Sequence, residues 1–244
     1  MDEKEFDLII EKALKNGLQE LDLSSTWLTP FPPTLWQLTN LTALDLSDND
    51  LEALPAEIGQ LTNLTILRAT WSVLETLPRE IGQLANLTSL DLSKNLLKRL
   101  PVEIGQLANL MELSLGGNRF EMLPPEIGQL TNLTSLDLSK NQFRTLPEEI
   151  GQLINLTRLD LSWNELDRLP LEITQLTNLA YLDLRHNLLP IPAEVLCRVD
   201  EPAVIIECYL NIIKSQTNNS LGLFTEYTWP SYKPTRRRYE HNIS

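Results

Sequence analysis

Residues 130–152 read LTNLTSLDLSKNQFRTLPEEIGQ, and eight near-copies of this 23-residue unit fill the chain from Lys15 to Arg198. One series of aspartates and one of prolines recur with this step or its double. The aspartates are Asp45, Asp91, Asp137, Asp160 and Asp183, and the prolines are Pro32, Pro55, Pro78, Pro101, Pro124, Pro147 and Pro170. A fixed period of this length predicts a solenoid whose neighbouring units share one core.

Each part of the unit has a predicted role. Apolar and polar residues alternate over 134–139, so Leu136 and Leu138 should face inward, as in a half-buried strand. Parallel stacking then gives a ribbon about 35 Å long at about 4.8 Å per strand. The asparagine after each strand should bond turn backbone, in a column of Asn49, Asn95, Asn118, Asn141, Asn164 and Asn187. The L-P-x-E-I-G-Q segment predicts a helical turn that directs Ile150 into the core.

The spacing L-x-x-L-x-L-x-x-N-x-L, carried by Leu133, Leu136, Leu138, Asn141 and Phe143, resembles the leucine-rich repeat over about three quarters of the chain. This resemblance implies an α/β solenoid of horseshoe form. Its concave face would carry a parallel β-sheet, its convex side short helical or 3-10 turns, and both ends helical caps. The units are also similar to those of plant intracellular Ras-group-related repeat proteins, which implies a role in signalling scaffolds.

The two ends of the repeat array are expected to be caps. In residues 1–17 an amphipathic helix is predicted, and repeats are assigned to 15–198. The predicted helix places these apolar residues on one side: Phe6, Ile9, Ile10, Ala13 and Leu14. A second capping helix is expected within 199–214, with a buried stripe of Val204, Ile205, Cys208, Tyr209, Ile212 and Ile213. The basic, aromatic tail 215–244 is expected to be loosely ordered or docked on the C-terminal cap.

Residues 191–216 also resemble the junction that follows the repeats in bacterial Roco proteins, where a Ras-like GTPase domain comes next. That domain would need the phosphate-binding loop G-x-x-x-x-G-K-[ST]. Gly222 is the only glycine after Gly151, so no GTPase activity is expected of this chain. The resemblance leaves the hypothesis of a detached or truncated sensor region of a Roco-type GTPase or kinase signalling protein.

Composition excludes several classes of function. The net charge of −13 disfavours nucleic acid as a partner. No run of about 18 apolar residues predicts a membrane span, and the acidic N-terminus is unlike a signal peptide. Only Cys197 and Cys208 are present, which favours a reduced, cytoplasmic protein with core-packing thiols, although a bridge between them stays open. His186 and His241 have no neighbours at metal-ligand spacing, so we expect no metal site and no histidine-based catalysis. We therefore expect a protein that is not an enzyme and binds no cofactor. We also expect it to be a monomer.

An acidic column is predicted at the central exposed strand position. It comprises Asp22, Asp45, Asp91, Asp137, Asp160 and Asp183. One interpretation is structural, because aspartate next to serine belongs to this repeat consensus. The other is a strip that attracts a basic peptide or domain.

Departures from the repeat indicate candidate binding residues. The third unit reads RATWS where others read DLSxN, which puts Arg68 in the aspartate column and Trp71 on the exposed side. This is either drift or a contact patch. A second group, on exposed positions of the last two units, comprises Arg158, Trp163, Tyr181, Arg185 and His186. Because Arg, Trp and Tyr dominate interface energetics, this C-terminal cluster is the leading binding-site candidate.

The sequence therefore predicts a non-catalytic module that binds a protein or a basic peptide on its concave face. An alternative is autoinhibition by the tail. Residues 215–244 carry four Lys or Arg and two Glu, a charge of +2, which leaves −13 − 2 = −15 for the rest. In this hypothesis the run Arg236–Arg238 lies across the acidic face.

Overall fold

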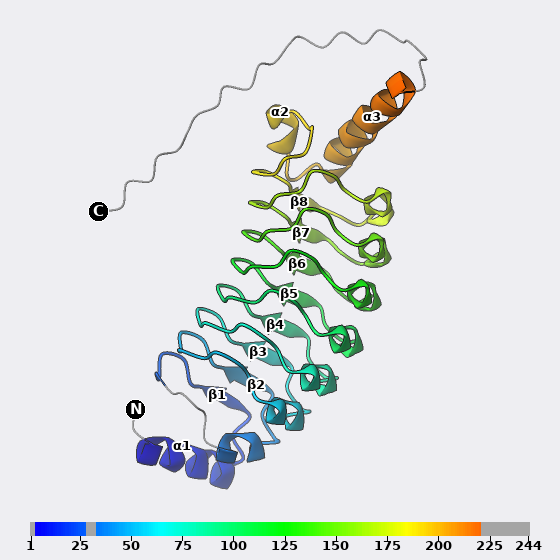
Figure 1. Ribbon diagram of the computed structural model, residues 1–244. Helices are drawn as coiled ribbons and strands as arrows, with labels where there is room; N and C mark the ends of the chain where they lie inside the picture. The colour runs from blue at the N-terminus through cyan, green and yellow to red at the C-terminus, as the bar shows by residue number, and fades with distance from the viewer. Residues whose placement is uncertain (1–2, 28–32, 221–244) are drawn as a thin grey trace, which may run out of the picture.

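The computed structural model describes residues 3–27 and 33–220, and in them eight short strands form one parallel sheet in chain order (Figure 1). In every strand but the last, each residue pairs with the residue 23 positions further on, as Leu136 does with Leu159. The strands are β1 Glu20–Asp22, β2 Ala43–Asp45, β3 Ile66–Arg68, β4 Ser89–Asp91, β5 Glu112–Ser114, β6 Ser135–Asp137, β7 Arg158–Asp160 and β8 Tyr181–Asp183. This constant step confirms the predicted solenoid and its parallel sheet.

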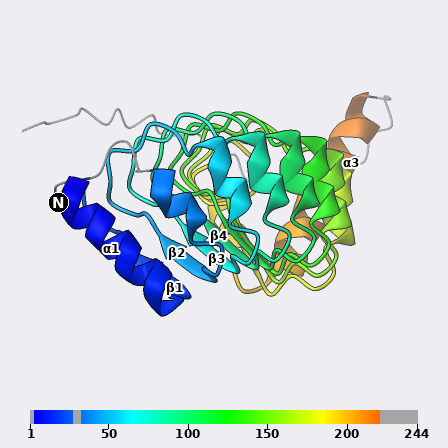
Figure 2. The ribbon, with the colours of Figure 1, turned by 90° about the horizontal axis from the view of Figure 1, so that it is seen from below.

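Short 3-10 turns return the chain between strands and lie on the side opposite the sheet (Figure 2). They are η1 Pro33–Gln37, η2 Ala56–Gln60, η3 Arg79–Gln83, η4 Val102–Gln106, η5 Pro125–Gln129, η6 Glu148–Gln152 and η7 Leu171–Gln175. Pro55 and its equivalents up to Pro170 precede η2 to η7 in extended conformation, which fixes the direction in which each turn begins.

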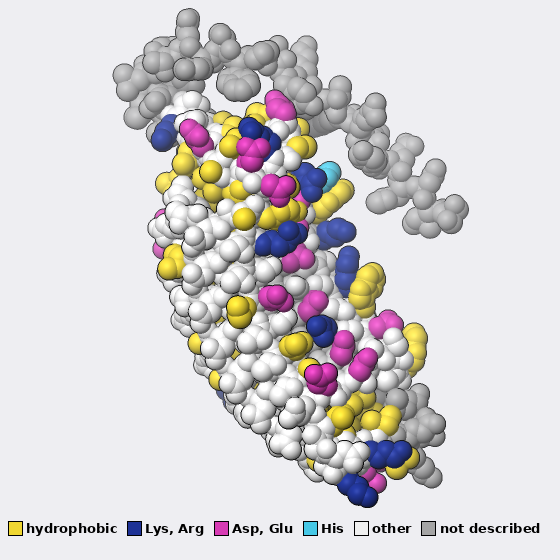
Figure 3. All heavy atoms as spheres, turned by 180° about the vertical axis from the view of Figure 1, so that it is seen from behind, with side chains coloured by type: hydrophobic (Ala, Val, Ile, Leu, Met, Phe, Trp, Pro, Cys, Tyr) yellow, Lys and Arg dark blue, Asp and Glu magenta, His cyan; other side chains and the backbone are white. Residues whose placement is uncertain are grey.

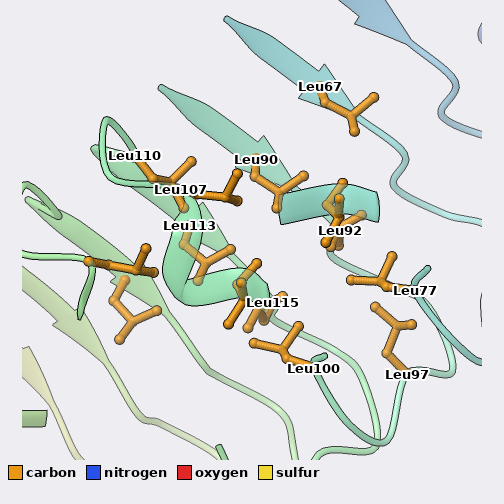
Figure 4. Packing of buried hydrophobic residues seen from close by; sticks show 14 of the residues in the cluster. Leu67, Leu77, Leu90, Leu92, Leu97, Leu100, Leu107, Leu110, Leu113 and Leu115 are labelled. Atoms are coloured by element: carbon orange, nitrogen blue, oxygen red, sulfur yellow. The ribbon is translucent and has the colours of Figure 1, made fainter. Parts of the chain in front are cut away.

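One continuous core runs between the sheet and the turns, and leucine is its main component (Figure 4). In the fifth unit Leu107 and Leu110 enter it from the turn side, while Leu113 and Leu115 enter from the strand. All four are at most 1% exposed. Complete burial of one leucine contributes about 2 kcal/mol. Because the leucines of one unit are buried only when neighbouring units cover them, the stacking of units stabilises the fold.

The asparagine column bonds turn backbone at the strand exits, as predicted, and all of its members but half-buried Asn187 are buried. Asn141 Nδ2 donates to the carbonyl oxygens of Leu115 (3.0 Å) and Leu138 (3.1 Å), and its Oδ1 accepts from the Phe120 backbone (3.1 Å). The column therefore binds each turn to the unit before it. In the third unit Ser72 replaces the asparagine, and the Asn49 backbone donates to its hydroxyl at 3.4 Å.

Helix α1, Glu3–Asn16, lies at the N-terminal end of the core (Figure 1). Phe6, Ile10 and Ala13 are buried there, and Ile9 packs against the same core. The expectation for Leu14 is wrong, because its side chain is 43% exposed. Leu14 lies in the last turn of the helix, just before the chain leaves at Gly17 with φ of +60°.

The C-terminal end carries two helices, α2 Ala193–Leu196 and α3 Pro202–Ser220. The sequence did not predict α2. Ile205 and Tyr209 of α3 are buried, and the Tyr209 hydroxyl both accepts from the Leu169 backbone N–H (2.9 Å) and donates to the Leu169 carbonyl (3.0 Å). These two hydrogen bonds attach α3 to the seventh unit.

Helix α3 extends past the predicted end at residue 214, so the assignment of 215–220 to a loose tail is wrong. The segment SQTNNS contains neither Gly nor Pro, and nothing in it forces a helix to end. The rest of the tail, including the run 236–238, and His241 lie outside the described residues. Both cysteines are free thiols, and Cys197 is exposed rather than packed in the core. Within 3–27 and 33–220, no helix has the length and apolarity that crossing a membrane requires.

Candidate functional site

The aspartate column lies in register across the strands, with Arg68 and Ser114 at its two other positions. Each carboxylate accepts a hydrogen bond from the backbone two residues further on, as Asp137 does from Ser139 at 2.8 Å. The same bond forms at the other aspartates: Asp22, Asp45, Asp91, Asp160 and Asp183. One oxygen of every carboxylate thus shapes the strand exit, which agrees with the structural interpretation of the column.

The residue three positions after each position of the aspartate column, Arg68 and Ser114 included, has a left-handed backbone, with φ between 51° and 71°. We name these positions the strand-exit column: Ser25, Asp48, Trp71, Lys94, Gly117, Lys140, Trp163 and His186. Left-handed backbone at a non-glycine residue costs about 1 kcal/mol. Backbone hydrogen bonds between units offset this cost, since the Trp163 backbone N–H donates to the Arg185 carbonyl at 2.9 Å. The sequence placed Trp71 and Trp163 near the strand exits but gave no signal of this conformation.

The third unit presents Trp71 and Arg68 to solvent, and the Trp71 side chain is 66% exposed. Lys94 Nζ lies 5.4 Å from the centre of the Trp71 ring, within range of a cation–π contact. Ala69 is buried at a position where other units hold leucine. The two predicted contact residues of this unit are therefore accessible, and Trp71 is held by its neighbour.

The C-terminal cluster is brought together on adjacent units, as two stacked pairs. Trp163 and His186, both in the strand-exit column, stack with ring centres 3.7 Å apart. Arg158 of β7 places its guanidinium 3.7 Å from the centre of the Tyr181 ring of β8. Trp163 remains 54% exposed. The stacking restricts these side chains before any partner binds, which lowers the entropy cost of binding.

An ion pair lies next to Tyr181. Arg185 contacts buried Asp183 through Nε (3.0 Å) and Nη2 (2.5 Å), and the Tyr181 hydroxyl donates to Asp183 at 3.3 Å. Burial would raise the pKa of Asp183, but hydrogen bonds from the side chain and backbone of Arg185 outweigh it and hold that pKa below its usual range. Asp183 therefore stays ionised and fixes Arg185 and Tyr181 in place.

A polar groove follows the strand-entry side of the sheet, and sequence reasoning missed it. Its repeating members are an asparagine column, Asn40, Asn63, Asn86, Asn109, Asn132, Asn155 and Asn178, and a threonine column, Thr42, Thr65, Thr88, Thr134 and Thr157. Asn132 Nδ2 donates to the Ala108 carbonyl (2.8 Å), and Thr134 donates to the Met111 carbonyl (3.0 Å). Figure 3 looks onto the strand face and shows charged side chains gathered mainly on one side of it, beside a largely uncharged region. The Asn-Leu-Thr triplets that recur in five units were the available signal.

In the described part of the chain, no group of three or more His, Cys, Asp or Glu side chains is arranged to hold a metal ion. The aspartate column stands on an open face and is bonded to backbone. The geometry that the cluster does offer is a set of accessible flat side chains with guanidinium groups, which suits binding to another molecule.

Models of leucine-rich repeat families match four stretches of the chain. A leucine-rich repeat region matches residues 71–141, and leucine-rich repeats match residues 131–189, 37–53 and 17–38. With the eight-stranded parallel solenoid, these matches show that the chain belongs to the leucine-rich repeat family. The comparison with curated proteins gave no significant match.

Solved structures agree with this assignment. The chain is similar to a leucine-rich repeat protein of Leptospira interrogans, with 39% identity over 72% of this chain and 57% of that one and a TM-score of 0.57. It is also similar to the ectodomain of the Arabidopsis thaliana membrane receptor kinase GASSHO1/SCHENGEN3, solved in complex with CASPARIAN STRIP INTEGRITY FACTOR 2. That match has 33% identity, 65% and 23% coverage and a TM-score of 0.56.

An internalin of Listeria monocytogenes shares the fold at 20% identity, with 74% and 58% coverage and a TM-score of 0.59. The chain thus spans less than two thirds of the length of each of these three structures.

Proposed function

We propose that this protein is a non-catalytic interaction module that binds a protein partner on its concave face, with the C-terminal cluster as anchor. The supporting observation is the pair of stacked contacts, Trp163 on His186 and Arg158 on Tyr181, on adjacent units. Flat side chains that are exposed yet already restricted are typical of residues that dominate interface energetics. Leucine-rich repeats in general bind proteins, and one structural neighbour was solved with a bound partner.

The test is affinity capture from the source cell with wild type and with the double variant W163A/Y181A, read by quantitative mass spectrometry. We expect partners that bind the anchor to be depleted at least tenfold in the variant. Trp27→Ala is the matched control, because Trp27 is also exposed (69%) and left-handed but lies in the first unit. Equal capture by wild type and the double variant would remove this anchor.

Signalling and a cytoplasmic location are part of the proposal, supported by the acidic repeats, the two free thiols and the similarity of residues 191–216 to Roco junctions. The neighbouring gene offers a direct check. A reading frame for a GTPase beside this one is required if the chain is a detached Roco sensor region.

The charge difference between the tail and the repeats favours a second candidate, a tail-inhibited binding module. Deleting residues 221–244 should then increase partner binding, and the increase should shrink at high salt because long-range attraction is screened. An unchanged affinity at all salt concentrations would exclude autoinhibition.

A further inference from the structure

The charges that a partner meets at the C-terminal cluster differ from the formal charges of its residues. Two arginines and two aspartates balance formally. Arg158 lies 3.8 Å from Asp160, and their side chains are 48% and 16% exposed; Arg185 and Asp183 are 47% and 3% exposed. In both pairs the guanidinium is outside and the carboxylate beneath. The accessible part of each pair is therefore cationic.

Neighbouring charges do not reverse this sign. Lys140 precedes Trp163 in the strand-exit column and is exposed. Glu165, which follows Trp163 closely in sequence, is paired with Arg144 at 3.3 Å. Asp137, on the strand before Asp160, is half-buried and accepts from the Ser139 backbone. At this end of the solenoid, the net charge of the whole chain is a poor guide to the local surface.

The Arg158 guanidinium is held flat over Tyr181, and its distance from Asp160 is longer than a hydrogen bond. A planar guanidinium that is half exposed presents paired N–H donors, which match the two oxygens of a carboxylate or phosphate. The exposed Trp163 face lies in the same two units and offers apolar contact area. A complementary ligand must supply an anionic group together with a flat or apolar side chain.

We propose that the C-terminal cluster recognises an acidic peptide segment of its partner, in which carboxylates lie next to an aromatic residue. This inference rests on the proposed function and names the partner's chemistry. It runs opposite to the basic peptide expected from the aspartate column. Charge complementarity selects it, because a basic segment would meet guanidinium groups here while the carboxylates stay covered. For the same reason the basic tail of this chain is a poor occupant of the cluster.

The test uses three short fluorescein-labelled peptides in a Gly-Ser background and measures fluorescence anisotropy on the full chain. Their cores are Glu-Glu-Phe-Glu, Gln-Gln-Phe-Gln and Lys-Lys-Phe-Lys. We expect the Glu peptide to bind at least about tenfold more tightly than the other two, with an affinity that falls as salt rises. Circular dichroism of every variant establishes that it is folded.

Two variants separate the contributions of charge and aromatic surface. Arg158→Gln should weaken the Glu peptide about fivefold or more and leave the Gln peptide unchanged, whereas Arg158→Lys should restore part of the loss. Trp163→Ala should weaken the Glu and Gln peptides alike, and Trp27→Ala should weaken neither. This pattern would establish recognition of an acidic segment at the cluster.

Other outcomes overturn the inference in distinguishable ways. If the Lys or Gln peptide binds as tightly as the Glu peptide, and Trp163→Ala abolishes that binding, the cluster is a binding surface but does not prefer acidic segments. If the Glu peptide does not bind, or binds Arg158→Gln and Trp163→Ala as tightly as it binds wild type, the cluster does not recognise acidic segments. The capture experiment with W163A/Y181A then decides separately whether the cluster is an interface.

Discussion

Asn141 and Asn132 belong to the same unit, yet burial gives them different energetic roles. Asn141 is 8% exposed and satisfies backbone groups of two units, whereas exposed Asn132 makes one bond at the rim of the groove. A buried polar group left without a partner costs about 1–3 kcal/mol. The same residue type is therefore essential to stability at one position and nearly dispensable at the other.

Asn141→Ala should lower the free energy of unfolding by about 1–3 kcal/mol, because it strands the Phe120 N–H and removes one of the two asparagine hydrogen bonds that the Leu115 and Leu138 carbonyls each accept. Asn132→Ala should lower it by less than about 1 kcal/mol. Urea unfolding followed by circular dichroism measures both values. Similar losses for the two variants would contradict the assigned role of the buried column.

Asp183 predicts a pH dependence of stability. Its pKa is held below the ordinary value, so the ionised carboxylate stabilises the fold above its unfolded pKa of about 3.9, and this contribution is lost as pH falls through the folded pKa. Wild type should exceed Asp183→Asn in stability near pH 7. The difference should shrink as the pH is lowered below about 4 in urea-unfolding series. A difference that stays constant down to about pH 2 would exclude this linkage.

At the scale of the element, close packing of successive 3-10 turns explains the glycine of L-P-x-E-I-G-Q. A Cβ on Gly105 would lie 2.8 Å from the Glu126 carbonyl oxygen in the next turn, η5. In η7, after which no further 3-10 turn of the repeat type follows, the equivalent residue is exposed Thr174. In η2 to η6 the glycine therefore leaves room for the turn that follows, whereas η1 holds buried Trp36 at this position.

Gly105→Ala should therefore lower the free energy of unfolding by about 1–3 kcal/mol, because the backbone of η5 must move. Thr174→Ala, at the equivalent position of the last turn, should change it by less than about 0.5 kcal/mol. Thermal or urea unfolding tests the pair. A tolerated Gly105→Ala would show that the turns can separate without cost.

The repeat period was sufficient to predict strands, turns and the asparagine column, because each rests on a local pattern repeated many times. Features that occur only once in the chain were harder to predict from the sequence. The end of α3 was misplaced because residues 215–220 carry no helix-stop signal, and Leu14 was misplaced because helical spacing alone does not show where the core ends. The sign of the charge that the C-terminal cluster exposes depends on which side chain of each ion pair is more accessible. The positions of these residues in the repeat do not reveal this.

Across the whole molecule, each unit contacts mainly its neighbours, so stability should be lowest at the ends. The C-terminal end depends on Tyr209, whose hydroxyl satisfies both backbone groups of Leu169. The middle units have a stacked neighbour on both sides. Hydrogen exchange is therefore expected to be slowest around β4 to β6.

Tyr209→Phe should remove both bonds to Leu169 and lower stability by about 1–3 kcal/mol. Hydrogen exchange followed by mass spectrometry should show faster exchange in β7, β8 and α3, with β2 to β4 unchanged. Uniform acceleration along the chain would instead indicate that the solenoid unfolds as one cooperative unit.

The constant pairing step of 23 residues makes the chain extensible in whole modules. Excising residues 107–129 would join Gln106 to Leu130 in the same phase, so every remaining pairing keeps its register. Trp71 and Trp163 stand four modules apart, about 19 Å along the sheet at about 4.8 Å per strand. Duplication or loss of one module between the two tryptophans would change their separation by one strand spacing. The number of modules between them therefore sets the distance that a partner contacting both must span.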